Sequence, residues 1–161
     1  MSSLSKITRK SKKISPYAKG RRFELKTVQE LIKLGFKKVD AFTGAGKEYM
    51  HLGGKNDKGR DILCQVAGVT FVIQCKNWTG SNKINREITY AHCEVTRRCA
   101  KHYKSVAIGI IVAPSMSAFT PSAIKAAETA DDLILLSAID KLRLHATVNS
   151  RNGTFTHFRL P

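Results

Sequence analysis

Residues 61–76 read DILCQVAGVTFVIQCK, and this stretch decides the fold. Two apolar runs on either side of residues 67–68 predict the arms of a β-hairpin that closes at this small pair. Such a hairpin brings Asp61 back to the end of the second arm. Gln74 and Lys76 point there to one face, because side chains alternate along a strand. An acid, an amide oxygen and a lysine at one end of a sheet can hold a hard divalent cation and a phosphate.

The composition points to a polyanionic partner. Of 161 residues, 28 are Lys or Arg and 12 are Asp or Glu, which gives a formal net charge of +16. Nucleic acid is the leading candidate, ahead of an anionic membrane surface or a structural role in a ribosome-like particle. No run approaches the roughly 20 apolar residues of a membrane span, so no membrane partner is expected. With 42% hydrophobic residues, the chain can form one domain with a real core.

The N-terminal segment is basic and poor in apolar residues. Residues 1–23 hold eight Lys or Arg and no acid, so we expect a flexible basic arm at residues 1–16 and a single domain at residues 17–161. The arm is compatible with tracking along DNA, with a nuclear address at residues 9–13, or with a transit peptide. The same arm leaves open an RNA nuclease or a mitochondrial genome-maintenance factor.

The cysteines indicate a reducing compartment. The chain has four of them without a CxxC pair, and nothing in it resembles a secretory signal. We therefore expect an intracellular protein, in the nucleus or mitochondrion of a eukaryote and otherwise in the cytoplasm.

The rest of the chain alternates helical and extended patterns. We expect helices at residues 20–35 and 84–102, a helix capped by Thr120 with Pro121 at its first position, strands at residues 36–42, 106–113 and 133–136, a mobile, basic, glycine-rich loop at residues 43–60, and a closing hairpin from residues 142–148 and 154–160. This order predicts an α/β fold with a mixed sheet that helices cover on both faces.

The hairpin's polar end suits metal-assisted hydrolysis of a phosphodiester, in which a metal polarises the phosphate and lowers the pKa of an attacking water. The expected metal is Mg²⁺ (or Mn²⁺). Asp61 would bridge the metal, and the Gln74 amide and the Cys75 backbone carbonyl would each supply an oxygen. Glu24 would contribute a second carboxylate through water. Lys76 would stabilise the phosphate or orient the water. The plain structural alternative is a surface hairpin with an ion pair between Asp61 and Lys76.

The order of these motifs resembles the PD-(D/E)xK nuclease superfamily with its restriction-endonuclease-like fold. Within it, the chain looks most like Mrr-type domains and archaeal-type Holliday junction resolvases. Residues 20–24 (GRRFE) and 34–36 (LGF) look like the opening helix with its catalytic Glu, and residues 59–62 (GRDI) like the metal-binding Asp at a strand start. Residues 73–76 (IQCK) are similar to the QxK form of Mrr-type members, and residues 119–136 resemble the downstream helix and strand.

The resemblance implies a metal-dependent, structure-selective DNA endonuclease that hydrolyses phosphodiester bonds as the resolvases do in DNA recombination and repair. It also implies a homodimer acting on branched or double-stranded DNA, with Glu24, Asp61, Gln74 and Lys76 as the catalytic residues. Resolvases usually carry Glu at the position of Gln74. The alternative is therefore a nucleic-acid-binding protein on a nuclease fold that has lost or reduced its cleavage activity.

Recognition of DNA shape and backbone, rather than of bases, is expected from the charge density and from the lack of a separate DNA-reading domain. The expected phosphate contacts are Lys19, Arg21, Arg22, Lys47, Lys55, Arg60 and Lys83.

Overall fold

The computed structural model describes residues 13–53, 59–130, 133–142, 145–148 and 155–159. Its helices and strands follow one another as α1 (Pro16–Lys33), β1 (Lys37–Lys38), β2 (Glu48–His51), β3 (Ile62–Val66), β4 (Val69–Cys75), α2 (Arg86–Tyr103), β5 (Val106–Ala113), α3 (Pro121–Glu128), β6 (Ile134–Ala138), β7 (His145–Val148) and β8 (Phe155–Arg159). Within this described part, no helix is long and apolar enough to cross a membrane.

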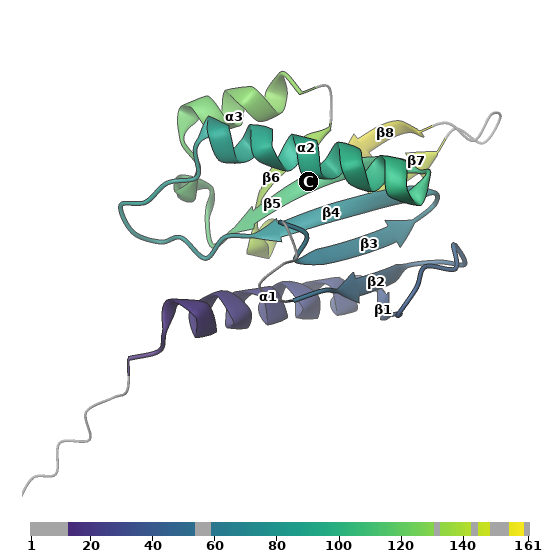
Figure 1. The fold of residues 1–161 in the computed structure, drawn as a ribbon, viewed down its shortest axis with the longest axis horizontal. Coiled ribbons are helices and arrows are strands. Elements are labelled where there is room, and N and C mark those ends of the chain that lie inside the picture. The colour runs from purple at the N-terminus through teal and green to yellow at the C-terminus, as the bar shows by residue number, and fades with distance from the viewer. Residues whose placement is uncertain (1–12, 54–58, 131–132, 143–144, 149–154, 160–161) are drawn as a thin grey trace, which may run out of the picture.

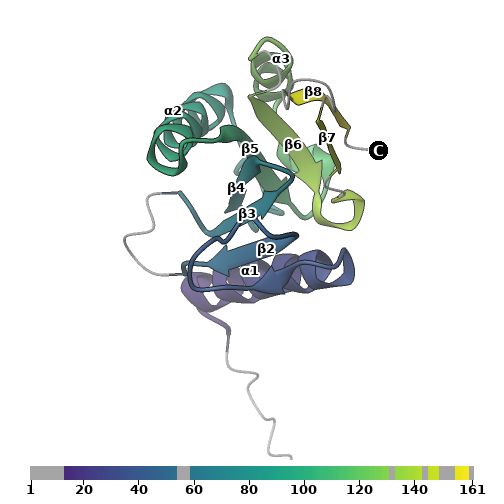
Figure 2. The ribbon, with the colours of Figure 1, turned by 90° about the vertical axis from the view of Figure 1, so that its right-hand side faces the viewer.

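A mixed sheet organises the molecule. In the described residues its six strands lie in the order β1-β2-β3-β4-β5-β6. Strands β2, β3 and β4 are antiparallel, whereas β4, β5 and β6 run parallel to one another. Helix α1 covers one face, and α2 and α3 cover the other (Figures 1 and 2). The predicted mixed α/β sheet with helices on both faces is therefore confirmed, and the closing hairpin exists as the separate antiparallel pair of β7 and β8.

The hairpin of β3 and β4 closes where the sequence predicts. Ala67 and Gly68 have φ angles of 52° and 77°, and two left-handed residues in succession form a primed turn that matches the twist of the strands. The turn sets the pairing register, in which Val66 lies opposite Val69 and Ile62 lies opposite Ile73. Continuing the same register brings Asp61 opposite the end of β4.

The two faces of the hairpin bury different side chains. On the α1 side, Leu31 packs in one cluster with residues such as Ile62, Phe71 and Ile110. On the α2 side, the alternate residues Leu63 and Val72 pack with Cys99 of α2. Burial on both faces explains why these strands read as nearly continuous apolar runs.

Helix starts are close to the predicted positions, with one correction. Thr120 caps α3 by accepting a hydrogen bond from the Ala123 N–H at 3.1 Å, as predicted. Helix α1 begins four residues before the predicted residue 20, because Ser15 accepts from the Ala18 N–H and Pro16 occupies the first turn. Residues 1–12 of the predicted arm lie outside the described residues.

The region from residue 36 to residue 60 differs from the prediction. The expected strand at residues 36–42 shrinks to the two residues of β1, and β2 lies inside the expected loop. The glycines and basic residues of this region predict a loop, and the strand within it begins with a buried acid. Glu48, which is 7% exposed, accepts hydrogen bonds from the Thr43 N–H, the Thr43 hydroxyl and the Gly44 N–H. These donors compensate its burial, although a carboxylate at a strand start argues against a core strand.

A buried histidine lies between α2 and the sheet. His92 is 1% exposed, and its Nε2–H donates to the Val72 carbonyl at 2.8 Å. Its Nδ1 has no hydrogen-bond partner among the described residues. Burial lowers the pKa of His92 from 6.5 to about 4; the hydrogen bond to Val72 opposes this shift and the charge of Lys76 adds to it. The imidazole is therefore neutral in the folded protein at neutral pH.

We expect His92 to make the fold sensitive to acid between pH 6.5 and pH 4. In this window the unfolded chain binds a proton that the folded chain does not, so the free energy of unfolding decreases as the pH falls. The loss from this residue should reach roughly 3 kcal/mol at pH 4. Urea unfolding at pH 7 and pH 4 would measure it, with His92→Gln as the comparison because glutamine keeps a donor and does not titrate. Parallel losses in both proteins would show that His92 is not the cause.

Candidate active site

Asp61 is held against the end of β4. It directly precedes β3, and its Oδ2 accepts a hydrogen bond of 2.6 Å from the backbone N–H of Cys75, the last residue of β4. The Asp61 N–H donates in turn to the Ile73 carbonyl at 3.0 Å. With only 8% of Asp61 exposed, the carboxylate has a fixed position at the edge where β3 begins and β4, β5 and β6 end.

The last residues of β4 divide between the two faces of the sheet. Cys75 points to the α1 side, where its Sγ lies 3.5 Å from the Thr27 hydroxyl. Gln74 points to the α2 side, because a Cβ built on Gly59 would lie 3.3 Å from its Nε2 and 3.7 Å from Val95 of α2. Lys76 follows β4, with its Nζ 5.3 Å from the centre of the Trp78 ring, and its charge acts on the pKa of His92 beneath α2. Cys75 and Gln74 thus lie on opposite faces of the sheet, as strand alternation predicts.

Glu24 reaches the same edge from the α1 side. Its Oε2 lies 2.9 Å from His51 Nε2 and 3.3 Å from the Arg21 guanidinium. His51 ends β2, and the next residue, Leu52, donates its N–H to the Asp61 carbonyl at 3.1 Å. The structure therefore brings Glu24 to the site through β2. No sequence pattern points to His51, because its glycine-rich surroundings predict a loop and its contact with Glu24 joins residues 27 positions apart.

The oxygen atoms available at this edge suit a Mg²⁺ ion that keeps most of its waters better than a metal ion coordinated by protein ligands alone. Among the described residues, no group of three or more His, Cys, Asp or Glu is arranged to hold a metal ion. Asp61 offers a carboxylate oxygen and Gln74 an amide oxygen, and Glu24 is already engaged by Arg21 and His51. Mg²⁺ accepts one or two carboxylates and keeps several waters, so this small oxygen set suits it.

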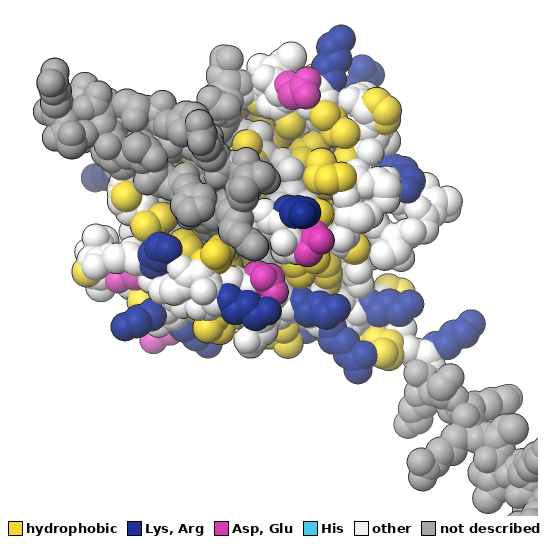
Figure 3. All heavy atoms as spheres, turned by 180° about the vertical axis from the view of Figure 1, so that it is seen from behind, with side chains coloured by type: hydrophobic (Ala, Val, Ile, Leu, Met, Phe, Trp, Pro, Cys, Tyr) yellow, Lys and Arg dark blue, Asp and Glu magenta, His cyan; other side chains and the backbone are white. Residues whose placement is uncertain are grey.

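The predicted phosphate contacts fall into several groups. Lys19 and Arg22 are exposed on α1, where Lys and Arg side chains gather along the edge that this helix forms (Figure 3). Arg21 lies against Gly53, where a Cβ would overlap its guanidinium. Lys47 and Lys83 donate to backbone carbonyls, of Leu34 and Ser117 respectively. Arg60 lines a cavity beside α2, and Lys55 lies outside the described residues.

Comparison with known protein families gives one match. A family model named Mrr_cat and described as a restriction endonuclease matches residues 17–145. Among solved structures, the chain is similar to the small subunit of the heterodimeric restriction endonuclease R.BspD6I, with 16% identity and a TM-score of 0.42. The similarity covers 74% of this chain and 63% of that subunit, so the chain spans less than two thirds of the subunit's length. No curated protein matches the chain.

Proposed function

The chain belongs to the Mrr_cat restriction endonuclease family and has a restriction-endonuclease-like α/β fold, and from this premise we propose that it is a divalent-metal-dependent endonuclease that cuts DNA. The resemblance to Mrr-type domains is thus confirmed, and the resolvase-like choice of substrate stays a proposal. One observation carries the proposal: Asp61 is hydrogen-bonded to the end of β4, and the strand register sets it opposite Gln74. The resemblance gives this position to the metal-binding Asp.

Each group at the site has a distinct role. The metal, when bound, polarises the scissile phosphate and lowers the pKa of the attacking water. The Asp61 carboxylate and the Gln74 amide oxygen would hold it, with the Cys75 carbonyl at the same strand end. Lys76 would stabilise the negative charge that develops on the phosphate oxygens. Glu24, positioned by His51 and Arg21, would orient a metal-bound water from the α1 side.

A cleavage assay with Lys76→Ala tests this proposal. We expect Mg²⁺ or Mn²⁺ to support cutting and the variant to lose about 100-fold or more in rate, since one charged donor to a transition state contributes about that much. Lys125→Ala is the matched control, because Lys125 is exposed near the end of α3. An unchanged rate in Lys76→Ala would exclude the assigned role of Lys76.

The substrate is proposed to be branched DNA, cut by a homodimer. The net charge of +16 and the exposed lysines and arginines of α1 support binding through the backbone. Four-way, flap and linear duplexes of equal length should be compared, with sedimentation of the free protein to measure its oligomeric state. Preference for the linear duplex would contradict structure selectivity, and a monomer at working concentration would contradict the homodimer.

A second candidate function is DNA binding on this fold without cleavage. The neutral Gln74 favours it, because Asp61 is then the one carboxylate proposed to contact the metal directly. Gln74→Glu discriminates between the two. In an active enzyme the added charge should lower the Mg²⁺ concentration for half-maximal cleavage by roughly tenfold. In a non-cutting protein the same substitution should create activity. Gln65→Glu, which adds the same charge at the far end of the hairpin, should do neither.

A further inference from the structure

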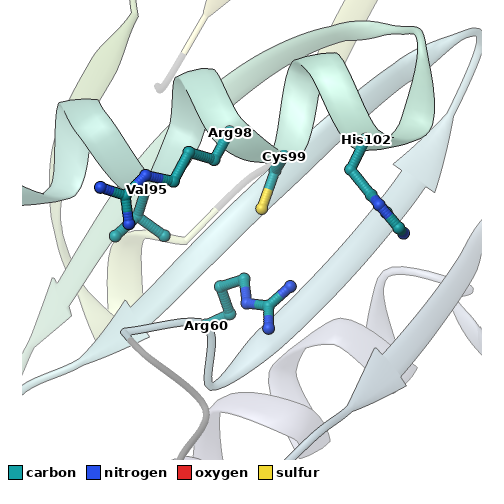
Figure 4. Close-up of a pocket in the computed structure, with 5 residues that line it drawn as sticks. All are labelled: Arg60, Val95, Arg98, Cys99 and His102. Atoms are coloured by element: carbon teal, nitrogen blue, oxygen red, sulfur yellow. The ribbon is translucent and has the colours of Figure 1, made fainter.

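A basic cavity of about 280 Å³ lies on the α2 face of the sheet. Arg60, from the segment before β3, lines one side, and Val95, Arg98, Cys99 and His102 of α2 line the other. In Figure 4, Arg60 extends beneath α2 toward Cys99. Arg98 and His102 are four residues apart, which places them on one side of the helix. Two segments distant in the sequence thus contribute cationic groups to one hollow.

The cavity is suited to an anion with an attached apolar body. Among the described residues, none of those that line the cavity is acidic. Arg97 pairs with Glu94 at 2.6 Å, whereas Arg98 has no hydrogen-bond or ion-pair partner in the part of the chain that the structure describes. Cys99 is buried and Val95 partly buried. Burial raises the pKa of the Cys99 thiol, and the neighbouring Arg60 acts against this shift, as expected for a guanidinium close to the cavity floor.

The cavity and the candidate active site share a wall. Gly59, with a φ of 83°, lies between Gln74 of the site and Val95 of the cavity. Of the next two residues, Arg60 lines the cavity and Asp61 belongs to the candidate active site, where it is hydrogen-bonded to the end of β4. A strand with a phosphate at the active site can therefore place a neighbouring group in the cavity.

We propose that this cavity binds the phosphate monoester at a DNA strand end, such as the end that a cut at the neighbouring active site creates. The proposal rests on the proposed function for its choice of DNA. A monoester carries a charge of about −1.5 to −2 at pH 7, more than the single charge of an internal phosphate. Guanidinium groups bind such phosphates through paired hydrogen bonds. The cavity has the volume of roughly nine waters, which suits one phosphate with its sugar and excludes a duplex.

The test is a binding measurement in EDTA, where no cutting occurs. Labelled single-stranded oligonucleotides with a 5′-phosphate, a 3′-phosphate or neither are titrated with the full chain, and inorganic phosphate serves as competitor. We expect one phosphorylated probe to bind about tenfold more tightly than the unphosphorylated one. Arg98→Ala should abolish this preference and Arg98→Lys should keep part of it. Arg97→Ala, which removes the same charge one residue away, should keep all of it.

The outcomes separate this proposal from the nuclease assignment. Asp61→Asn should keep the preference for a phosphorylated end even though it cuts far more slowly than wild type. A protein that never cuts but shows the Arg98-dependent preference would overturn only the nuclease function. The cavity proposal is overturned if wild type binds all probes equally, or if Arg97→Ala and Arg98→Ala weaken all probes by the same factor, since diffuse charge would then account for the binding.

Discussion

Asparagine in place of Asp61 should lower the rate of DNA cleavage by about 1,000-fold, equivalent to about 4 kcal/mol of transition-state stabilisation. The reason is the loss of the negative charge that holds the metal. Asparagine is the informative substitution because its side-chain oxygen can still accept the hydrogen bond from the Cys75 N–H. Alanine would remove that acceptor as well, and its effect on cleavage would include a loss of stability at the strand end.

Single-turnover cleavage across a Mg²⁺ titration measures the effect, and urea unfolding checks that the fold is intact. Asp40→Asn is the control, since Asp40 is exposed and lies outside the site. The control should cut at the wild-type rate. If Asp61→Asn also cuts at that rate in Mg²⁺, Asp61 is not a metal ligand.

Alanine in place of Gly109 should reduce the free energy of unfolding by about 3 kcal/mol. Gly109 lies in β5 directly beneath α2. A Cβ at this position would overlap the Thr96 hydroxyl and the Ile134 side chain, and would lie 3.0 Å from the His92 ring. Thr96 cannot easily move away, because its hydroxyl donates to the His92 carbonyl at 2.7 Å in a buried setting. Helix α2 would therefore have to shift outward from the sheet.

Urea unfolding measures this loss, and Gly20→Ala is the matched comparison. Gly20 lies inside α1, and a Cβ there would meet no atom within 4 Å. Alanine at that position should raise the free energy of unfolding by about 0.5–1 kcal/mol, as expected for a helix interior. Equal effects from the two substitutions would show that close packing under α2 does not explain Gly109.

Local signals predicted most of the fold. The β3–β4 hairpin and β5 were recognised because burial on both faces leaves uninterrupted apolar runs, and α3 because Thr120 and Pro121 form a strong start signal. Strand β2 could not be predicted, since the donors that satisfy Glu48 come from the loop before it. The sequence shows the acid but not the hydrogen bonds that make its burial possible.

The candidate site was predictable to the extent that strand alternation determines it. Their spacing alone predicts a shared face for Gln74 and Lys76, and the structure places Gln74 on the α2 side. The contact of Glu24 with His51 depends on how α1 crosses β2, and no sequence pattern encodes that crossing. The cavity could have been suspected, because the spacing of Arg98 and His102 places both on one helix face. Only the fold shows that Arg60 meets them there.

The length of the turn at Ala67 and Gly68 determines which residues are paired at the other end of the hairpin. From Val66 to Ile62 the paired arm covers about 14 Å, and the number of turn residues decides which residue of β4 lies opposite Asp61. A one-residue insertion there would exchange the two faces of one arm relative to the other, and would separate Asp61 from Gln74 without altering either. Members of this family should therefore vary freely in the loop that precedes Asp61, yet keep the length of this turn constant.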